Sequence, residues 1–200
     1  MANHRDFEVI RRHAVDVTLD PDTAHPSLIL SEDIKQVSLG DTKQDLPDNP
    51  KRFNQVPYVL GRECFSLGKF YFEVKVMGKN RWTLGVARDS INRKGEITER
   101  PKDGYWNVGL RYGTYKALNV HPVTLPIIEK PHKVGVFVDY EEGQVSFFNV
   151  DARCHIYSFT DQAFSGKLYP IFSPGFIYDS ENSAPLVICP VDCSFSHPGL

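Results

Sequence analysis

The stretch YFEVKVMGKNRWTLGVA, residues 71–87, decides the fold class of this chain. Its first six residues alternate in character, so that every second residue from Phe72 lies on one face of an extended strand. Glycine and asparagine at residues 78–80 favour a turn, and residues 82–87 form a second apolar run of strand length. The stretch therefore predicts two neighbouring β-strands joined by a short connection.

Short strand-like runs continue on both sides of this stretch and are separated by turns. Residues 134–138 are apolar on both faces, as in a central strand, and Gly143 closes the hairpin that follows. No long helical pattern alternates with these runs, which argues against a parallel sheet. We therefore expect an all-β sandwich or barrel. The expected strands are residues 15–19, 28–30, 37–39, 71–76, 82–87, 104–110, 115–118, 134–138, 145–148, 155–159, 168–172 and 186–189.

The composition is that of one soluble globular domain. The chain has 200 residues, of which 41% are hydrophobic and 24% charged. A domain of this length can form a stable core without disulfide bonds or bound metals. The formal net charge is -2, and the densest basic stretch, residues 79–102, is interrupted by Asp89, Glu96 and Glu99. Nucleic-acid binding needs a concentrated basic surface, so we expect no nucleic-acid partner.

The cysteines and the apolar segments indicate the compartment. Cys64, Cys154, Cys189 and Cys193 do not have the spacing of a small disulfide framework. The sequence contains no Asn-x-Ser/Thr site, no leader-like apolar start and no apolar run long enough to span a bilayer. We expect a cytoplasmic protein with reduced thiols and no direct membrane contact.

Two groups of residues have a spacing that is compatible with metal binding or catalysis, but neither predicts it. Cys189, Cys193 and His197 have a metal-like spacing but lack a clean second pair of ligands, although Cys154 or His155 could complete the set. Asp139 and Glu141 are better explained as supports of a hairpin turn than as a glycosidase pair. Nucleophile-elbow, Walker and dinucleotide motifs are missing, so we expect no catalytic residue, metal or cofactor.

An ordered series of short motifs resembles the PRY-SPRY family. Each motif is weak alone, but the whole series in family order over residues 12–191 is specific. One departure is Phe72, where the family usually carries a tryptophan whose indole N–H is a donor. The motifs are VDVTLDPDTA (15–24), LILSED (28–33), DNPKRF (48–53), VLG (59–61), SLGKFYFEV (66–74), WTLGVARDS (82–90), RKG (93–95), GYW (104–106), VGVFVDYE (134–141), SFFN (146–149) and PIFSPG (170–175).

The resemblance implies a bent antiparallel β-sandwich with short N-terminal helical turns. It divides the chain into an N-terminal arm or short helix (1–12), a PRY segment (13–57), a SPRY segment packed with it as one domain (58–192) and a tail (193–200). Family members include tripartite-motif ubiquitin ligases, butyrophilins and pyrin. The implied role is the non-catalytic, monomeric substrate-binding domain of such a ligase, with a link to innate immunity. The alternatives are a ligand-sensing domain of a butyrophilin-like receptor or a pyrin-like inflammasome protein.

The resemblance also implies a partner-binding surface made of loops at one end of the sandwich. Gly109 and Arg111 replace two tryptophans of the antibody-binding member, and Thr83 replaces its aspartate, so antibody binding is not expected. Thr83 also replaces a histidine used by phosphate-sensing butyrophilins. Phe176 either packs into the core or engages a partner together with Tyr178. The expected partner-binding residues are Lys43, Gln44, Arg81, Thr83, Glu99, Arg111, Tyr112, Phe176, Ile177 and Tyr178.

Overall fold

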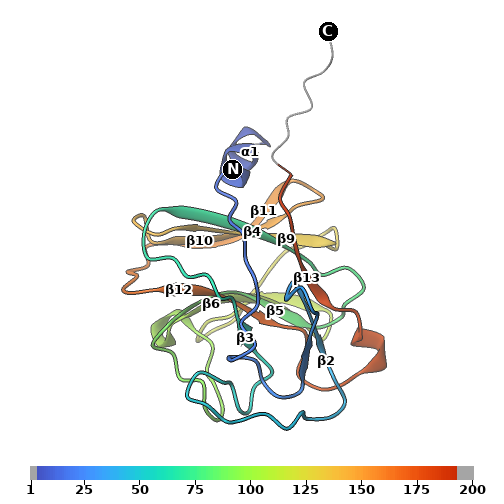
Figure 1. The fold of residues 1–200 in the computed structure, drawn as a ribbon. Coiled ribbons are helices and arrows are strands. Elements are labelled where there is room, and N and C mark those ends of the chain that lie inside the picture. Colours follow the sequence, from blue (N-terminus) through green and yellow to red (C-terminus); the bar gives the residue numbers. More distant parts are fainter. Residues whose placement is uncertain (1–3, 193–200) are drawn as a thin grey trace.

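Two antiparallel β-sheets face each other in a computed structural model that describes residues 4–192 (Figure 1). The seven-stranded sheet contains, in spatial order, β1 (Leu28–Leu30), β2 (Gln36–Leu39), β13 (Leu186–Cys189), β4 (Lys69–Lys75), β9 (Lys133–Asp139), β10 (Gln144–Asn149) and β11 (Cys154–Phe159). The six-stranded sheet contains β3 (Val59–Leu60), β12 (Leu168–Ser173), β5 (Trp82–Arg88), β6 (Tyr105–Arg111), β7 (Thr114–Ala117) and β8 (Val123–Thr124). The prediction of an all-β sandwich is confirmed.

Residues 15–19 are the one expected strand that does not form. The backbone makes a single bridge from Ala14 to Tyr71 in one sheet and another from Leu19 to Gly61 beside the other sheet. The segment therefore crosses between the layers, and Val17 and Leu19 are buried on the way. A chain that passes from one sheet to the other has no continuous neighbour with which to form a ladder. The short strands β3 and β8 were not expected.

The core lies between the sheets and follows the alternation seen in the sequence. Phe72 and Val74 of β4 point into it, whereas Tyr71 points to the outer side of the same sheet. The Phe72 ring centroid lies 6.0 Å from that of Phe172 in the opposite sheet. Phenylalanine thus fills the site where the family usually carries tryptophan.

A short helix covers the outer face of the seven-stranded sheet. This helix, α1 (His4–Arg11), buries Phe7 against Phe148, with ring centroids 5.3 Å apart. Arg11 Nε donates to the buried Glu73 carboxylate at 3.1 Å, and the Tyr71 hydroxyl donates to the same oxygen at 2.6 Å. Residues 4–11 are therefore packed onto the sheet. Neither α1 nor any other described helix has the length and apolar character that a bilayer crossing needs.

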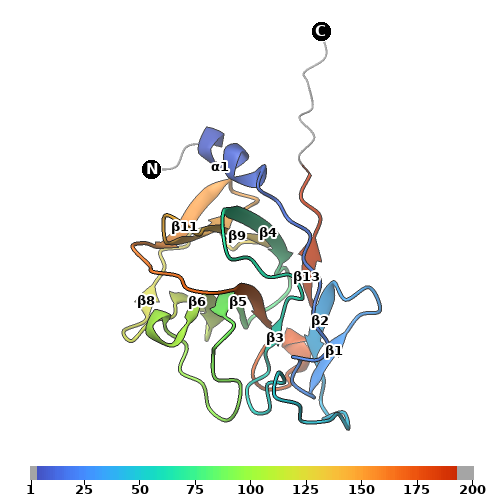
Figure 2. The same cartoon turned by 60° about the vertical axis from the view of Figure 1, so that its left-hand side comes forward.

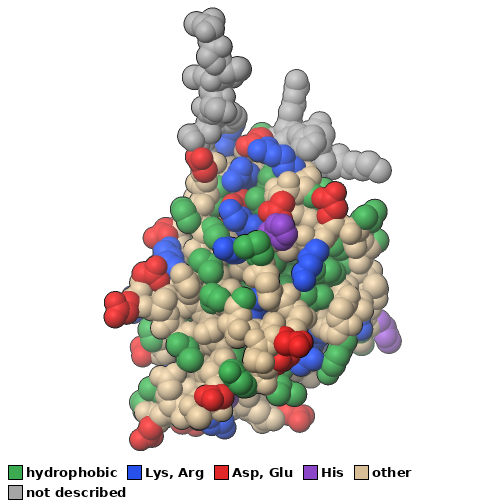
Figure 3. Space-filling view, turned by 90° about the vertical axis from the view of Figure 1, so that its right-hand side faces the viewer, with side chains coloured by type: hydrophobic (Ala, Val, Ile, Leu, Met, Phe, Trp, Pro, Cys, Tyr) green, Lys and Arg blue, Asp and Glu red, His purple; other side chains and the backbone are tan. Residues whose placement is uncertain are grey.

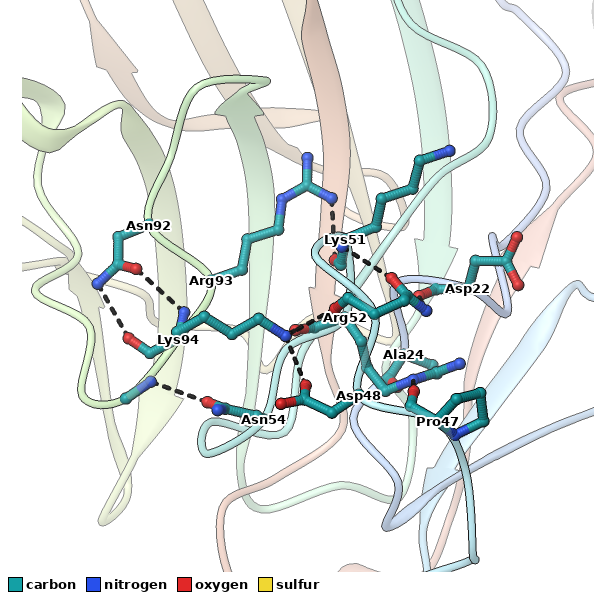
Figure 4. Close-up of polar contacts among 12 residues, drawn as sticks. Asp22, Ala24, Pro47, Asp48, Lys51, Arg52, Asn54, Asn92, Arg93 and Lys94 are labelled. Atoms are coloured by element: carbon teal, nitrogen blue, oxygen red, sulfur yellow. Dashed lines mark hydrogen bonds and ion pairs between the residues drawn. The ribbon is translucent and has the colours of Figure 1, made fainter.

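The long connection between β2 and β3 is fastened to the loop that follows β5 (Figure 4). Lys94 Nζ donates to Asp48 Oδ1 at 2.6 Å and to the carbonyl oxygens of Asn49 at 2.7 Å and Arg52 at 2.6 Å. An ammonium group has three donors, and all three are used. Arg93 Nη1 adds a contact to the carbonyl of Lys51 at 2.9 Å. The connection before β3 and the loop after β5 are thus tied together by side chains.

A second, smaller apolar cluster lies on the outer face of the six-stranded sheet. The connection from β2 to β3 and the loop before β6 fold over this face, as the lower part of Figure 2 shows. Short 3₁₀ turns, η1 (Pro101–Asp103) and η2 (Ser180–Asn182), lie in the loops around it. The cluster consists of Phe53, Tyr58, Leu60, Ala87, Ile91, Tyr105 and Ile171. It ends at Tyr58, where the polar residues described next begin.

Candidate partner-binding face

Strand register brings most of the expected partner-binding residues to one end of the six-stranded sheet. Thr83 pairs with Gly109 on one side and with Ser173 on the other. Because β5 runs antiparallel to both neighbours, its beginning meets the ends of β6 and β12. Arg81 precedes β5, Arg111 ends β6, and the loop 174–182 follows β12. We call this end of the sheet, with its loops, the loop face.

Arg111 and Phe176 form the inner pair of the loop face. The guanidinium carbon of Arg111 lies 4.5 Å from the centroid of the Phe176 ring. Its Nη2 donates to Glu99 Oε2 at 2.9 Å and to Thr83 Oγ1 at 3.3 Å. The Glu99 side chain is only 10% exposed and that of Arg111 29%. The inner pair is therefore largely removed from solvent, and its charge is already neutralised.

Gly109 explains how Arg111 reaches inward. Residues 109 and 111 lie on the same face of β6, because side chains alternate along a strand. A Cβ at Gly109 would lie 2.9 Å from the carbonyl oxygen of Trp82, 3.3 Å from Thr83 Oγ1 and 3.8 Å from Arg111 Nε. With no side chain at this position, the arginine can fold back over the strand to Thr83 and Glu99. Gly109 thus leaves space for the ion pair between Arg111 and Glu99.

Polar atoms gather beneath the inner pair. Asn107 Nδ2 donates to the other oxygen of Glu99 at 3.0 Å, and Tyr58 packs edge-on against Phe176 with centroids 5.9 Å apart. Burial, followed by the Glu99 charge, raises the pKa of Tyr58 well above its ordinary value. Within residues 4–192, three buried atoms here lack a hydrogen-bond partner: Tyr58 Oη, Asn107 Oδ1 and Arg111 Nε. Incompletely satisfied polar groups are typical of functional sites.

Arg81 and Tyr112 form the outer pair. The Arg81 guanidinium carbon lies 4.6 Å from the centroid of the Tyr112 ring. Tyr112 is 87% exposed, and no carboxylate in the described part of the chain forms an ion pair with Arg81. Tyr112 and Gly113 make the two-residue turn between β6 and β7, with φ of 52° and 75°. Both positions of such a turn need a positive φ, which Asn and Gly adopt readily. Tyr112 does not, so its backbone is strained.

Asn182 and Lys79 hold the loop 174–182 in place. Asn182 Oδ1 accepts from the backbone N–H groups of Asn80 and Arg81, and its Nδ2 donates to the carbonyls of Arg81 and Pro174. Lys79 is 1% exposed and donates to the carbonyls of Asn182 at 2.9 Å and Ala184 at 2.6 Å. Burial lowers the pKa of Lys79 to about 8. We call these contacts the Asn182 clasp; they fix the backbone at Arg81 and at both ends of the loop 174–182, which carries Phe176.

A cavity of about 340 Å³ opens between the outer pair and the loop 174–182. Ile177 and Tyr178 line it and remain 72% and 51% exposed, whereas Phe176 is only partly exposed and packs inward. Phe176 and Tyr178 thus point to different environments, although they are two residues apart. The lining consists of Asn80, Arg81, Ile177, Tyr178, Asp179 and Asn182.

Lys43 and Gln44 lie apart from the other expected residues. Gln44 Nε2 donates to the carbonyl of Leu28 at 2.7 Å, which fastens the loop to β1, and Lys43 is exposed. Burial, together with the Lys43 charge, lowers the pKa of His25. Within the described residues, neither side chain forms a hydrogen bond or ion pair with the loop face. The loop nevertheless starts after Leu39, whose Cδ2 would lie 3.9 Å from a Cβ at Gly175.

The sequence did not reveal Tyr58, Asn107, Lys79 and Asn182 as parts of this face. Only Asn107 could have been found from the sequence. It is a polar residue in the middle of an apolar strand, and it lies on the same face of that strand as Gly109 and Arg111. Tyr58 and Asn182 reach the face from loops, and their roles depend on contacts with residues far away in the chain.

The two chemical constellations weighed in the sequence have structural surroundings of different kinds. Asp139 Oδ1 accepts from the backbone of Glu142 at 3.3 Å, and the Glu141 carboxylate accepts from the backbone of Gly68. Asp139 thus supports the hairpin turn, in which Gly143 has a φ of 65°, whereas Glu141 ties the hairpin to the loop before β4. Cys193 and His197 lie outside the described residues. Between residues 4 and 192, no cluster of three His, Cys, Asp or Glu side chains is suited to hold a metal ion.

Comparison with protein families places these features in context. The sequence matches the SPRY domain over residues 69–186 and the SPRY-associated domain, PRY, over residues 17–65. It is 49% identical to human zinc finger protein RFP over 192 residues, which is 96% of this chain and 37% of that protein. It is 50% identical to human pyrin over 180 residues, or 90% of this chain and 23% of pyrin. Mouse E3 ubiquitin-protein ligase TRIM21 is 45% identical over 185 residues, or 92% of this chain and 39% of the ligase.

A solved structure supports the fold independently. The TRIM65 PSpry domain superposes with a TM-score of 0.77 at 22% identity, covering 91% of this chain and 93% of that domain. The chain spans less than two fifths of the length of the three relatives above.

Proposed function

This chain belongs to the PRY-SPRY family, and on that premise we propose that it is a non-catalytic module that recognises a partner protein through the loop face. The observation that carries the proposal is the pairing of a rigid scaffold with exposed aromatic and basic side chains. Two sheets and the Asn182 clasp fix the loops, whereas Arg81, Tyr112, Ile177 and Tyr178 reach solvent or line the cavity. Arg and Tyr are enriched among the residues that dominate protein–protein binding energy.

We further propose that the whole protein is a tripartite-motif E3 ubiquitin ligase for which this domain selects the substrate. The support is the similarity to TRIM21, whose name states that activity. A role in innate immunity, a cytoplasmic location and a monomeric isolated domain belong to the same proposal. So do the function of the PRY (13–57) and SPRY (58–192) segments as one unit and a contribution of Lys43 and Gln44 to partner contact.

A pyrin-like parent protein is the second candidate, because pyrin is as similar to this chain as the ligases are. A butyrophilin-like receptor is a further alternative. The reading frame upstream of residue 1 separates them. A RING domain, B-box and coiled coil would support the ligase, and a transmembrane span would support the receptor.

Charge on the surface supports a protein partner over a nucleic acid. On the face drawn in Figure 3, acidic and basic side chains are interspersed, and hydrophobic side chains form small separate groups. A nucleic acid would require a continuous basic track. A protein partner needs only a few well-placed anchors within a polar rim.

Affinity capture with two matched variants tests the proposed face. The first variant combines Arg81→Ala, Tyr112→Ala and Tyr178→Ala. The control combines Leu67→Ala, Val120→Ala and Ile128→Ala, which are exposed apolar residues elsewhere on the domain. We expect the proteins captured by the parent domain to be lost with the first variant and kept with the control, at unchanged melting temperatures. Retention of every captured protein by the first variant contradicts the proposed face.

A further inference from the structure

Arg81 is a cation at a cavity rim without an acidic partner in residues 4–192. The described contacts of Arg81 are backbone hydrogen bonds to Asn182 and the cation–π contact of its guanidinium with the Tyr112 ring. We propose, building on the function above, that the cavity between Arg81 and Tyr178 binds an acidic side chain of the partner protein, with a neighbouring apolar residue of the partner packed on Ile177. The loop face would then select partner segments that combine Asp or Glu with an adjacent apolar residue.

The Arg81 guanidinium is held ready for a carboxylate. Asn182 binds both the N–H and the C=O of Arg81, at 3.1 Å in each case, so the backbone is fixed. The Tyr112 ring supports the side chain from one side by a cation–π contact, which leaves the edges of the fork for hydrogen bonds. A side chain ordered in advance loses less entropy on binding.

The strain at Tyr112 is consistent with this role. A tyrosine in the left-handed region costs about 1 kcal/mol relative to the residues that suit the turn. Its ring gains little from the core, because it is 87% exposed. Its described ring contact is the one with Arg81. A strained Tyr112 that packs on Arg81 and not on the core indicates that this tyrosine contributes to binding and not to folding stability.

The cavity lining favours a single carboxylate over a doubly charged phosphate. Asp179 lines the same cavity, and its Oδ1 accepts from the backbone of Glu181 at 3.0 Å. The loop side of the cavity thus carries one acidic side chain. A carboxylate can lie at the Arg81 side, away from Asp179, whereas a dianion would be repelled more strongly. Arg111 is not available as a second cation, because Glu99 neutralises it.

The apolar half of the ligand follows from Ile177 and Tyr178. Both side chains are largely exposed on a loop whose backbone the Asn182 clasp holds. A cavity of about 340 Å³ is at the small end of ligand sites and suits one or two side chains. An acidic side chain at Arg81 and an apolar one on Ile177 would fill it.

Nuclear magnetic resonance with two capped dipeptides tests the proposal directly. The probes are acetyl-Leu-Glu-amide and acetyl-Leu-Gln-amide, which differ only in the charge and one terminal group of the second side chain. We expect the Glu probe to shift the Nε–H signal of Arg81 and the amides of Ile177 and Tyr178, and to bind about fivefold more tightly than the Gln probe. Arg81→Gln should abolish the difference. Arg62→Gln, which changes an exposed arginine elsewhere, should preserve it.

Several results would overturn the proposal while leaving the face itself intact. Equal shifts of Ile177 and Tyr178 with both probes, and none at Arg81, would mean that the face binds peptides without reading charge. A preference for acetyl-Leu-phosphoserine-amide, or for acetyl-Leu-Leu with a free carboxyl terminus, would assign Arg81 to those groups instead. If none of the probes changed any chemical shift and the face variant still lost its captured proteins, the acidic ligand would be refuted and the partner-binding face would stand. Failure of the proposed function has a separate readout, which is capture that survives the face variant.

Discussion

The inner and outer arginine–aromatic pairs of the loop face have almost the same geometry and opposite environments. Arg111 lies 4.5 Å from the Phe176 centroid, and Arg81 lies 4.6 Å from the Tyr112 centroid. Arg111 is also bound to Glu99 and Thr83 under a partly buried ring. Arg81 has no ion pair in the described residues, and its aromatic partner is almost fully exposed.

An arginine beside an aromatic ring can therefore serve either stability or recognition. A charge that is desolvated and paired stabilises its surroundings only while its partner remains, because an unpaired buried charge is costly. A charge that is exposed contributes little to stability but remains available to a ligand. We therefore assign folding to the inner pair and binding to the outer pair, and the following changes test that division.

The largest effect is expected at the Asn182 clasp, which joins Arg81 of the outer pair to the loop that carries Phe176 of the inner pair. Asn182→Ala removes four hydrogen bonds, one to the buried carbonyl of Pro174 and three to partly buried backbone groups of Asn80 and Arg81. We expect a loss of about 3 kcal/mol in the free energy of unfolding, measured by urea denaturation. Hydrogen exchange should also become faster in residues 174–182.

Asn119→Ala is the matched control, because Asn119 is exposed and its side chain contacts only the next backbone N–H. It should change the free energy of unfolding by less than about 0.5 kcal/mol. A similar small effect for Asn182→Ala would mean that the clasp does not hold the face together.

The second change separates the two pairs directly. Glu99→Ala removes the carboxylate that accepts from Arg111 and Asn107, in a site that is mostly closed to water, and leaves Arg111 only the hydrogen bond to Thr83. We expect a loss of about 2 kcal/mol in the free energy of unfolding, because the remaining charge is only partly exposed. Arg81→Ala should lower it by less than about 0.5 kcal/mol, since that arginine is unpaired.

A double-mutant cycle makes this comparison quantitative. Glu99→Ala combined with Arg111→Ala should cost less than the sum of the two single changes, because each single change leaves a partner buried alone. Additive losses would show that the inner ion pair contributes nothing of its own, and the division between the pairs would then fail.

The sequence predicted the sandwich well because its signal is repeated along the chain. Alternation in β4 and the turns before and after each strand depend on neighbouring residues only, so residues 71–76 and 82–87 were placed within one or two positions. The prediction of a strand over residues 15–19 was wrong, because an apolar segment that crosses between two sheets has the same local sequence pattern as a strand.

The site was predictable in position but not in the roles of its residues. Register explains why Arg81, Thr83 and Arg111 meet, and the ordered motifs had already indicated that end of the sheet. Arg111 is the paired arginine because Glu99 lies beside it and because Gly109 leaves space for its side chain. Both conditions depend on contacts between strands and loops that are distant in the sequence. Asn182 is about a hundred residues away from Arg81 in sequence, so no local pattern could connect them.

A pH dependence should reveal Lys79, the buried cation of the Asn182 clasp. Burial lowers the pKa of Lys79 in the folded state to about 8, whereas in the unfolded chain it returns to its ordinary value near 10.5. The unfolded state therefore binds more protons between these values, and stability rises with pH by up to about 1.4 kcal/mol per unit. Denaturation at pH 7 to 10 measures it.

Lys79→Met supplies the control for that slope. Below pH 8 both states keep Lys79 protonated, so no slope from this group is expected there. Above pH 10 the trend should reverse, because burial raises the pKa of Tyr58, Tyr71 and Tyr105 in the folded state. The variant should lose the rise between pH 8 and 10. A rise that persists in Lys79→Met would assign it to another group.

The smallest effect on stability, and the most specific one, is expected at Tyr112. Tyr112→Asn places a residue that suits the left-handed turn position, so the free energy of unfolding should increase by about 0.5 kcal/mol. Partner capture, and the response of Arg81 to acetyl-Leu-Glu-amide, should decrease in the same variant because the guanidinium loses its supporting ring. A gain in stability together with a loss in binding is the signature of a strained residue kept for recognition. If Tyr112→Asn lowered stability and left binding unchanged, Tyr112 would be part of the folding apparatus, and the contrast between the two pairs would disappear.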